Sequence, residues 1–135
     1  MMNVMQLRAR KLRVLIVEDG ITMRMFYRDV LERAGFEVEE AVNGLEGVER
    51  AMTGSFDLLV VDINMPKMDG LQLLAAMKNS HEWRDVPVVM ITTEGGETKV
   101  GEAVRLGAAG YVRKPFTADQ IMEKLVGILE PAMQL

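Results

Sequence analysis

Hydrophobic residues gather in three short runs, each bounded by polar or turn-forming residues. The runs occupy residues 14–17, 58–61 and 88–91 and are rich in β-branched side chains. Neither strict alternation nor helical spacing occurs within them, which is typical of strands covered on both faces, as in a parallel sheet. Two further strands are predicted. Residues 36–41 form a more polar, partly alternating strand suited to a sheet edge, and Tyr111-Val112 form a short last strand.

Between these strands, residues that would share one face of a helix recur every three or four positions, which is the spacing of an amphipathic helix. Five stretches show this spacing, marked by Met23, Phe26, Val30 and Ala34; Leu45, Val48 and Met52; Leu71, Leu74 and Lys78; Val100 and Val104; and Ile121, Leu125 and Ile128. Gly35 is predicted to end the first helix in a left-handed conformation, and Gly54 to end the second. Thr117 and Gln120 have the spacing of a capping box before the last helix. The pattern predicts an α/β fold of five β–α units, with helices on both faces of a five-stranded parallel sheet.

Polar side chains follow four of the predicted strands, at the edge where the ligands of such sheets bind. They are Glu18 and Asp19 after the first strand, Asp62 after the third, Thr92 after the fourth and Lys114 after the fifth. From Asp19 onward the spacings are 43, 30 and 22 residues, and each fits one or two β–α units. We therefore expect three carboxylates, a hydroxyl and an ammonium to converge on one edge of the sheet.

The chemistry of this cluster follows from its charges. Carboxylates held a few ångströms apart repel each other, so a proton or a cation must neutralise them. An all-oxygen site favours a hard cation, Mg²⁺ first and Mn²⁺ as an alternative. A carboxylate can also attack phosphorus, which makes Asp62 the candidate for an aspartyl-phosphate. Lys114 would then pair with the phosphoryl group, and the Thr92 hydroxyl would hydrogen-bond it.

The candidate metal ligands come from two strand ends. Asp19 is expected to bind the cation directly, and Glu18 directly or through water. Asp62 would contribute one carboxylate oxygen while the other acts as nucleophile. The backbone carbonyl of Asn64 is the fourth candidate ligand.

Length and composition narrow the class of protein. A chain of 135 residues fits one globular domain, which we place at residues 12–130, with an N-terminal extension at 1–11 and a C-terminal tail at 131–135. The net charge of -4 argues against nucleic-acid binding, and no apolar run approaches the ~20 residues that span a bilayer. Because the chain has no cysteine, disulfides and thiolate metal sites are excluded, and a reducing cytoplasm is the expected location. We expect a monomer.

Four motifs carry a resemblance to a known family: Val17-Glu18-Asp19, Thr22-Met23-Arg24, Asp62-Ile63-Asn64-Met65-Pro66-Lys67-Met68-Asp69-Gly70 and Gly110-Tyr111-Val112-Arg113-Lys114-Pro115-Phe116. Over residues 12–129 the chain resembles the response-regulator receiver family, and within it the stand-alone chemotaxis type. The resemblance implies a flavodoxin-like, doubly wound fold with strand order 2-1-3-4-5. It also implies a cis peptide bond between Lys114 and Pro115.

The resemblance further implies the partners and the switch. A histidine kinase would donate a phosphoryl group to Asp62, and the chain would be a phosphoacceptor rather than an enzyme with a separate substrate. Thr92 and Tyr111 would couple the phosphate to the surface of the fourth helix, fifth strand and fifth helix. The expected target is a flagellar motor switch, a chemoreceptor kinase complex or a phosphorelay protein.

Departures from the family pattern concern access to the site. Glu18 stands where an aspartate is common, and its longer arm can reach a metal through water. Thr93 stands where alanine is frequent and narrows access to the phosphoryl group. The lifetime of the phosphorylated state therefore depends on how water passes Asn64 and Thr93.

Other functions fit the sequence less well. A phosphatase of the haloacid-dehalogenase type needs an acid two residues after its nucleophile, and Asn64 occupies that position. A nucleotide or flavin carrier needs donors in the first loop, where Glu18 and Asp19 would repel a phosphate. A degenerate receiver that only binds partners is the remaining alternative.

Overall fold

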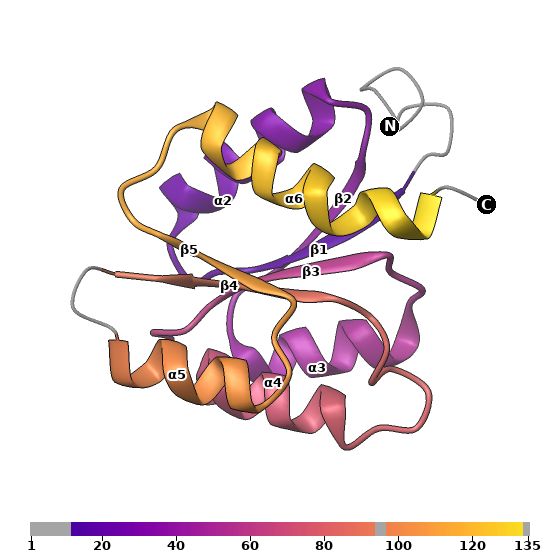
Figure 1. Ribbon diagram of the computed structural model, residues 1–135, viewed down its shortest axis with the longest axis vertical. Coiled ribbons are helices and arrows are strands. Elements are labelled where there is room, and N and C mark those ends of the chain that lie inside the picture. Colours follow the sequence, from indigo (N-terminus) through magenta and orange to yellow (C-terminus); the bar gives the residue numbers. More distant parts are fainter. Residues whose placement is uncertain (1–11, 94–96, 134–135) are drawn as a thin grey trace.

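The computed structural model describes residues 12–93 and 97–133, so the predicted N-terminal extension lies outside the described residues. Strands and helices alternate along the chain (Figure 1). Their order is β1 (Arg13–Val17), α2 (Ile21–Arg33), β2 (Glu37–Ala41), α3 (Gly44–Thr53), β3 (Leu58–Asp62), α4 (Gly70–Lys78), β4 (Val88–Thr92), α5 (Glu97–Arg105), β5 (Gly110–Arg113) and α6 (Ala118–Met133). All five strands are parallel, in the order β2-β1-β3-β4-β5. The predicted doubly wound fold is confirmed.

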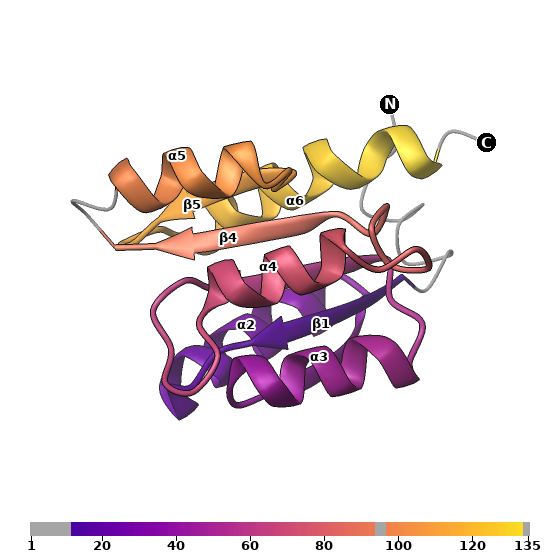
Figure 2. The ribbon, with the colours of Figure 1, turned by 90° about the horizontal axis from the view of Figure 1, so that it is seen from below.

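Helices cover both faces of the sheet. Figure 1 shows α2 and α6 on one side and α3, α4 and α5 on the other, and in Figure 2 the arrows of β1 and β4 point the same way. Alternate residues of β1 enter two separate hydrophobic clusters, Val14 and Ile16 toward α2 and α6, Leu15 and Val17 toward the other helices. This double burial explains why the central strands lack an alternating pattern.

Local signals set several helix ends as the sequence predicts. Gly35 has φ of 97° just after α2, where a left-handed residue closes the helix. At the start of α6 the backbone N–H of Thr117 donates to Gln120 Oε1 at 2.8 Å, and the N–H of Gln120 donates to Thr117 Oγ1 at 3.1 Å. A second capping box, Asp69 with Gln72, starts α4 directly after the loop that leaves β3.

The buried face of α3 differs from the prediction. The spacing predicts that Leu45, Val48 and Met52 face the core; Val48 packs against it, but Leu45 is 51% and Met52 40% exposed. Small residues such as Gly47 and Ala51 are buried instead. A Cβ added at Gly47 would lie 2.7 Å from a side chain of α4, so the helices approach too closely there for large residues. The hydrophobic spacing missed this face because glycine and alanine carry little hydrophobic signal.

None of the helices in the described part of the chain combines the length and hydrophobicity that a membrane span requires.

Candidate functional site

The carboxyl ends of β1, β3, β4 and β5 bring the predicted site residues together. Glu18 and Asp19 follow β1, Asp62 is the last residue of β3, Thr92 is the last residue of β4, and Lys114 follows β5. One carboxylate oxygen from each of the three acids lies within 4.8 Å of the other two. Glu18 and Asp62 are buried, while Asp19 is exposed at the rim.

The Lys114 ammonium lies between the two buried acids. Its Nζ is 3.0 Å from Asp62 Oδ2 and 3.4 Å from Glu18 Oε1. The backbone N–H of Lys114 donates to the carbonyl of Thr92 at 2.7 Å, which ties the segment after β5 to the end of β4. The peptide bond between Lys114 and Pro115 is cis, as the resemblance implies.

Burial changes the acidity of this cluster. Glu18 is 3% exposed, and its Oε2 accepts a hydrogen bond from the backbone N–H of Gly20 at 2.8 Å. Burial, together with a hydrogen bond to Asp62, raises the pKa of Glu18 to about 7. Burial alone would lower the pKa of Lys114, but the hydrogen bond and negative charge of Asp62 outweigh it and raise that pKa. The ammonium therefore keeps its charge, while Glu18 readily takes up a proton.

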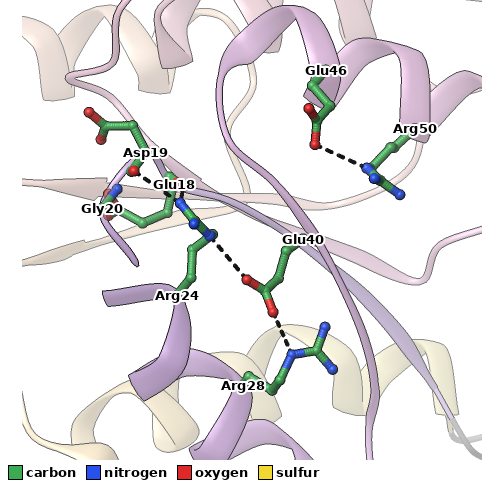
Figure 3. Close-up of polar contacts among 8 residues, drawn as sticks. All are labelled: Glu18, Asp19, Gly20, Arg24, Arg28, Glu40, Glu46 and Arg50. Carbon is green, nitrogen blue, oxygen red and sulfur yellow. Dashed lines mark hydrogen bonds and ion pairs between the residues drawn. The ribbon is translucent and has the colours of Figure 1, made fainter. Parts of the chain in front are cut away.

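Arg24 anchors the loop that carries the acidic pair (Figure 3). Its Nη1 donates to the carbonyls of both Glu18 and Asp19 at 2.9 Å, and its Nε donates to Glu40 Oε1 at 3.0 Å. The other oxygen of Glu40 accepts from Arg28 Nε. Arg24 belongs to the Thr22-Met23-Arg24 motif, but the sequence did not predict its contacts with the acidic loop. Its guanidinium fork fixes the backbone of the acidic loop against β2.

Asn64 connects Asp62 with α5. The backbone N–H of Asn64 donates to Asp62 Oδ1 at 2.9 Å, and its side-chain Oδ1 accepts from Lys99 Nζ at 2.9 Å. Both Asn64 and Lys99 are exposed. Sequence reasoning did not find Lys99, because no motif or periodic signal marks it.

The two predicted switch residues lie on β4 and β5. Thr92 is 1% exposed, and its hydroxyl donates to the carbonyl of Thr93 at 3.3 Å. Tyr111 is 37% exposed, and the guanidinium of Arg113 lies 5.9 Å from the centre of its ring. The tyrosine ring thus lies at the surface of β5 rather than within the core.

The donor set fits a hard divalent cation. Three carboxylates that can place oxygens within 4.8 Å of one another make an all-oxygen site. Two of them are buried, which strengthens their mutual repulsion and so favours neutralisation by a cation. Lys114 contacts two of these acids, Glu18 and Asp62, so its single ammonium offsets only part of the charge that the three carboxylates can carry.

A doubly wound α/β domain with three acids and a lysine at its carboxyl edge has the architecture of a signalling receiver. The chain matches the response regulator receiver domain over residues 14–126 and belongs to that family. The family uses Mg²⁺ at its acidic pocket, and its chemotaxis-type members take phosphate from histidine kinases and act on downstream targets.

Several similar proteins are named as chemotaxis proteins. The chain is 38% identical to chemotaxis protein CheY1 of Helicobacter pylori, with 87% of this chain and 97% of the relative covered. It is 39% identical to chemotaxis protein CheY-3 of Vibrio cholerae, with 90% and 94% covered. A solved structure of Vibrio cholerae chemotaxis protein CheY4 has a TM-score of 0.83 at 34% identity and covers 87% of this chain and 98% of that one.

Proposed function

We propose that the chain accepts a phosphoryl group on Asp62 from a histidine kinase and that this modification switches its binding to a protein target. The observation that carries the proposal is the Asp62 carboxylate itself. It is 5% exposed, it lies 3.0 Å from an ammonium, and it shares its crevice with two further acids. In the reaction an Asp62 oxygen attacks phosphorus, the bond from phosphorus to the kinase histidine breaks, and the imidazole leaves.

The neighbouring residues have separate roles in this proposal. Glu18, Asp19 and Asp62, with the backbone carbonyl of Asn64, are the groups that would hold Mg²⁺, or Mn²⁺ in its place. A bound divalent cation supplies positive charge to the phosphoryl oxygens. Lys114 exchanges its contact with Asp62 for one with a phosphoryl oxygen, since its ammonium already lies at that carboxylate.

An apolar surface beside the crevice suits the incoming kinase. Ile21 and Met25, one turn apart at the start of α2, are each 66% exposed. Next to them is a largely apolar pocket, lined by Thr22, Met23, Phe26, Lys114, Pro115 and Phe116. A donor that brings a phosphohistidine to Asp62 must cover this rim, so we place the kinase contact here. We also propose that the chain is cytoplasmic and monomeric, with its receiver domain at residues 12–130.

The output follows from the switch residues. On phosphorylation the Thr92 hydroxyl turns toward the phosphoryl group, and the Tyr111 ring, now at the surface, packs inward. This changes the surface formed by α5, β5 and α6, where Val104 is also exposed. Because the relatives are named chemotaxis proteins, a flagellar motor switch or a phosphorelay protein is the target that we propose.

Phosphorylation by a small donor tests the chemistry. The protein is incubated with phosphoramidate and Mg²⁺, and its intact mass is measured. Wild type should gain one phosphoryl group, Asp62→Asn should gain none, and Asp85→Asn, which alters an exposed loop acid, should behave as wild type. Equal masses of wild type and Asp62→Asn after treatment would refute the proposal and favour the phosphorylation-independent interaction module.

Loading with beryllofluoride and Mg²⁺ tests the switch. The ring resonances of Tyr111 and the amide resonances of α5 should shift in wild type and remain unchanged in Asp62→Asn. If they do not move in wild type, the proposed output surface is wrong even where phosphorylation succeeds.

A further inference from the structure

One polar chain leads from the phosphoacceptor to the helix after β4. Asp62 Oδ1 accepts from the backbone N–H of Asn64, and the side-chain oxygen of Asn64 accepts from Lys99 Nζ, both at 2.9 Å. Asn64 and Lys99 are 35 residues apart in the sequence, so the contact is a tertiary one. It joins the loop after β3 to the first turn of α5.

The topology places this bridge on the edge of the sheet that carries Asp62. Strands β3 and β4 are neighbours in the sheet, with Asp62 paired to Ile91 in register. Asn64 follows the carboxyl end of β3, and Lys99 lies on the helix that follows β4. Their side chains therefore meet beyond the two strand ends, on the edge of the sheet where a group attached to Asp62 would project.

Lys99 also fixes how the Asn64 amide is turned. An ammonium only donates, so it binds the amide oxygen and orients the NH₂ group away from itself. Without Lys99 the exposed Asn64 side chain would lose this hydrogen bond and would be free to rotate. The hydrogen bond from the backbone N–H of Asn64 to Asp62 would remain, because it does not involve the Asn64 side chain.

We propose that Lys99 is a positioning residue that holds the Asn64 amide over the aspartyl-phosphate and so slows its hydrolysis; this rests on the proposed function. In hydrolysis a water oxygen attacks phosphorus, the bond between phosphorus and the Asp62 oxygen breaks, and inorganic phosphate leaves with the protons of the water. The water must approach in line with the breaking bond, from the open side of the crevice. In this proposal the fixed Asn64 side chain narrows that approach.

The expected effect is modest, because the bridge is exposed. Exposed interactions of this kind change an equilibrium only slightly, so removing Lys99 should accelerate hydrolysis about two- to fivefold. Lys99→Met removes the donor and keeps most of the side-chain length. Lys99→Arg keeps both the charge and a donor. Lys67→Met removes a nearby exposed lysine of the loop after β3 and is the matched control for charge.

The experiment measures the decay of the phosphorylated protein. Each variant is loaded with phosphoramidate and Mg²⁺, the donor is removed, and the phosphoryl mass is followed over time. Lys99→Met should decay two- to fivefold faster than wild type, while Lys99→Arg and Lys67→Met should decay at about the wild-type rate. Asn64→Ala should also decay faster, and adding Lys99→Met to it should cause no further acceleration.

Three results would overturn the proposal. The first is decay of Lys99→Met no faster than that of wild type. The second is decay of Lys67→Met as fast as that of Lys99→Met. The third is an equal acceleration of decay by Lys99→Met in the Asn64→Ala background. The second and third would assign the effect to charge alone rather than to the position of Asn64. Failure of the proposed function is distinct, since then wild type itself would take up no phosphoryl group.

Discussion

The buried acid Glu18 makes the stability of this protein depend on pH near neutrality. Burial, with a contribution from Asp62, raises its pKa from 4.5 to about 7. At 1.36 kcal/mol per pKa unit, this difference corresponds to about 3 kcal/mol of unfolding free energy. Glu18→Gln should remove this dependence, because the amide replaces the protonated acid in the same space and its oxygen can still accept from Gly20.

The sign of the effect follows from proton binding. Between pH 4.5 and 7 the folded protein holds the Glu18 proton more tightly than the unfolded chain does. The stability that Glu18 contributes is therefore complete below pH 4.5 and is lost as the pH rises through 7. The unfolding free energy of Glu18→Gln minus that of wild type should grow by about 2 to 3 kcal/mol from pH 4.5 to about pH 8.

Urea unfolding in the presence of a chelator, at a series of pH values, measures this difference. Glu82→Gln, at an exposed loop position, is the control and should shift the stability by less than about 0.5 kcal/mol at every pH. Parallel curves for wild type and Glu18→Gln would refute the reasoning. Such curves would mean that Glu18 has the same affinity for its proton in the folded and unfolded states.

Three further substitutions test single contacts by urea unfolding. Tyr27→Phe should raise the unfolding free energy by about 1 kcal/mol, because the buried Tyr27 hydroxyl has no hydrogen-bond partner among the described residues. Gly70→Ala should lower the unfolding free energy by about 1–3 kcal/mol, because its Cβ would lie 2.4 Å from the carbonyl oxygen at the end of β3. The control Gly101→Ala should not lower it, because a Cβ there would have no neighbouring atom within 4 Å. Arg24→Met should cost about 2 kcal/mol by leaving two carbonyls without their donor, whereas Arg33→Met, in an exposed ion pair, should cost less than about 0.5 kcal/mol.

The order of strands and helices could be predicted because each unit carries its own local signal. Central strands buried on both faces read as continuous hydrophobic runs, and Gly35, Thr117 and Gln120 mark helix ends through chemistry that acts within a few residues. Once five β–α units are recognised, handedness and parallel pairing leave few arrangements. The same reasoning places Asp62 and Lys114 on one edge, because both follow the carboxyl ends of strands.

What the sequence could not predict depends on distances between segments. Lys99 reaches Asn64 only because β4 lies beside β3 and α5 begins near that edge, and no sequence spacing encodes this reach. An arginine such as Arg24 is common on the exposed face of a helix. Its side chain instead turns back and donates to two backbone carbonyls of the preceding loop. The buried face of α3 was misread for a related reason, since close packing there selects small residues over hydrophobic ones.

The charges of the crevice bear on how the proposed Mg²⁺ would bind. Asp62 is paired with Lys114, and Glu18 is about half protonated at neutral pH, so the exposed Asp19 would be the acid most open to a cation. Glu18 would give up its proton to hold the cation, so we expect cation binding to strengthen as the pH rises through 7. Lys114, which lies at both buried acids, would be the group that turns to a phosphoryl oxygen in the proposed reaction. In the proposed function, Glu18 would thereby couple cation binding to the proton balance of the buried crevice.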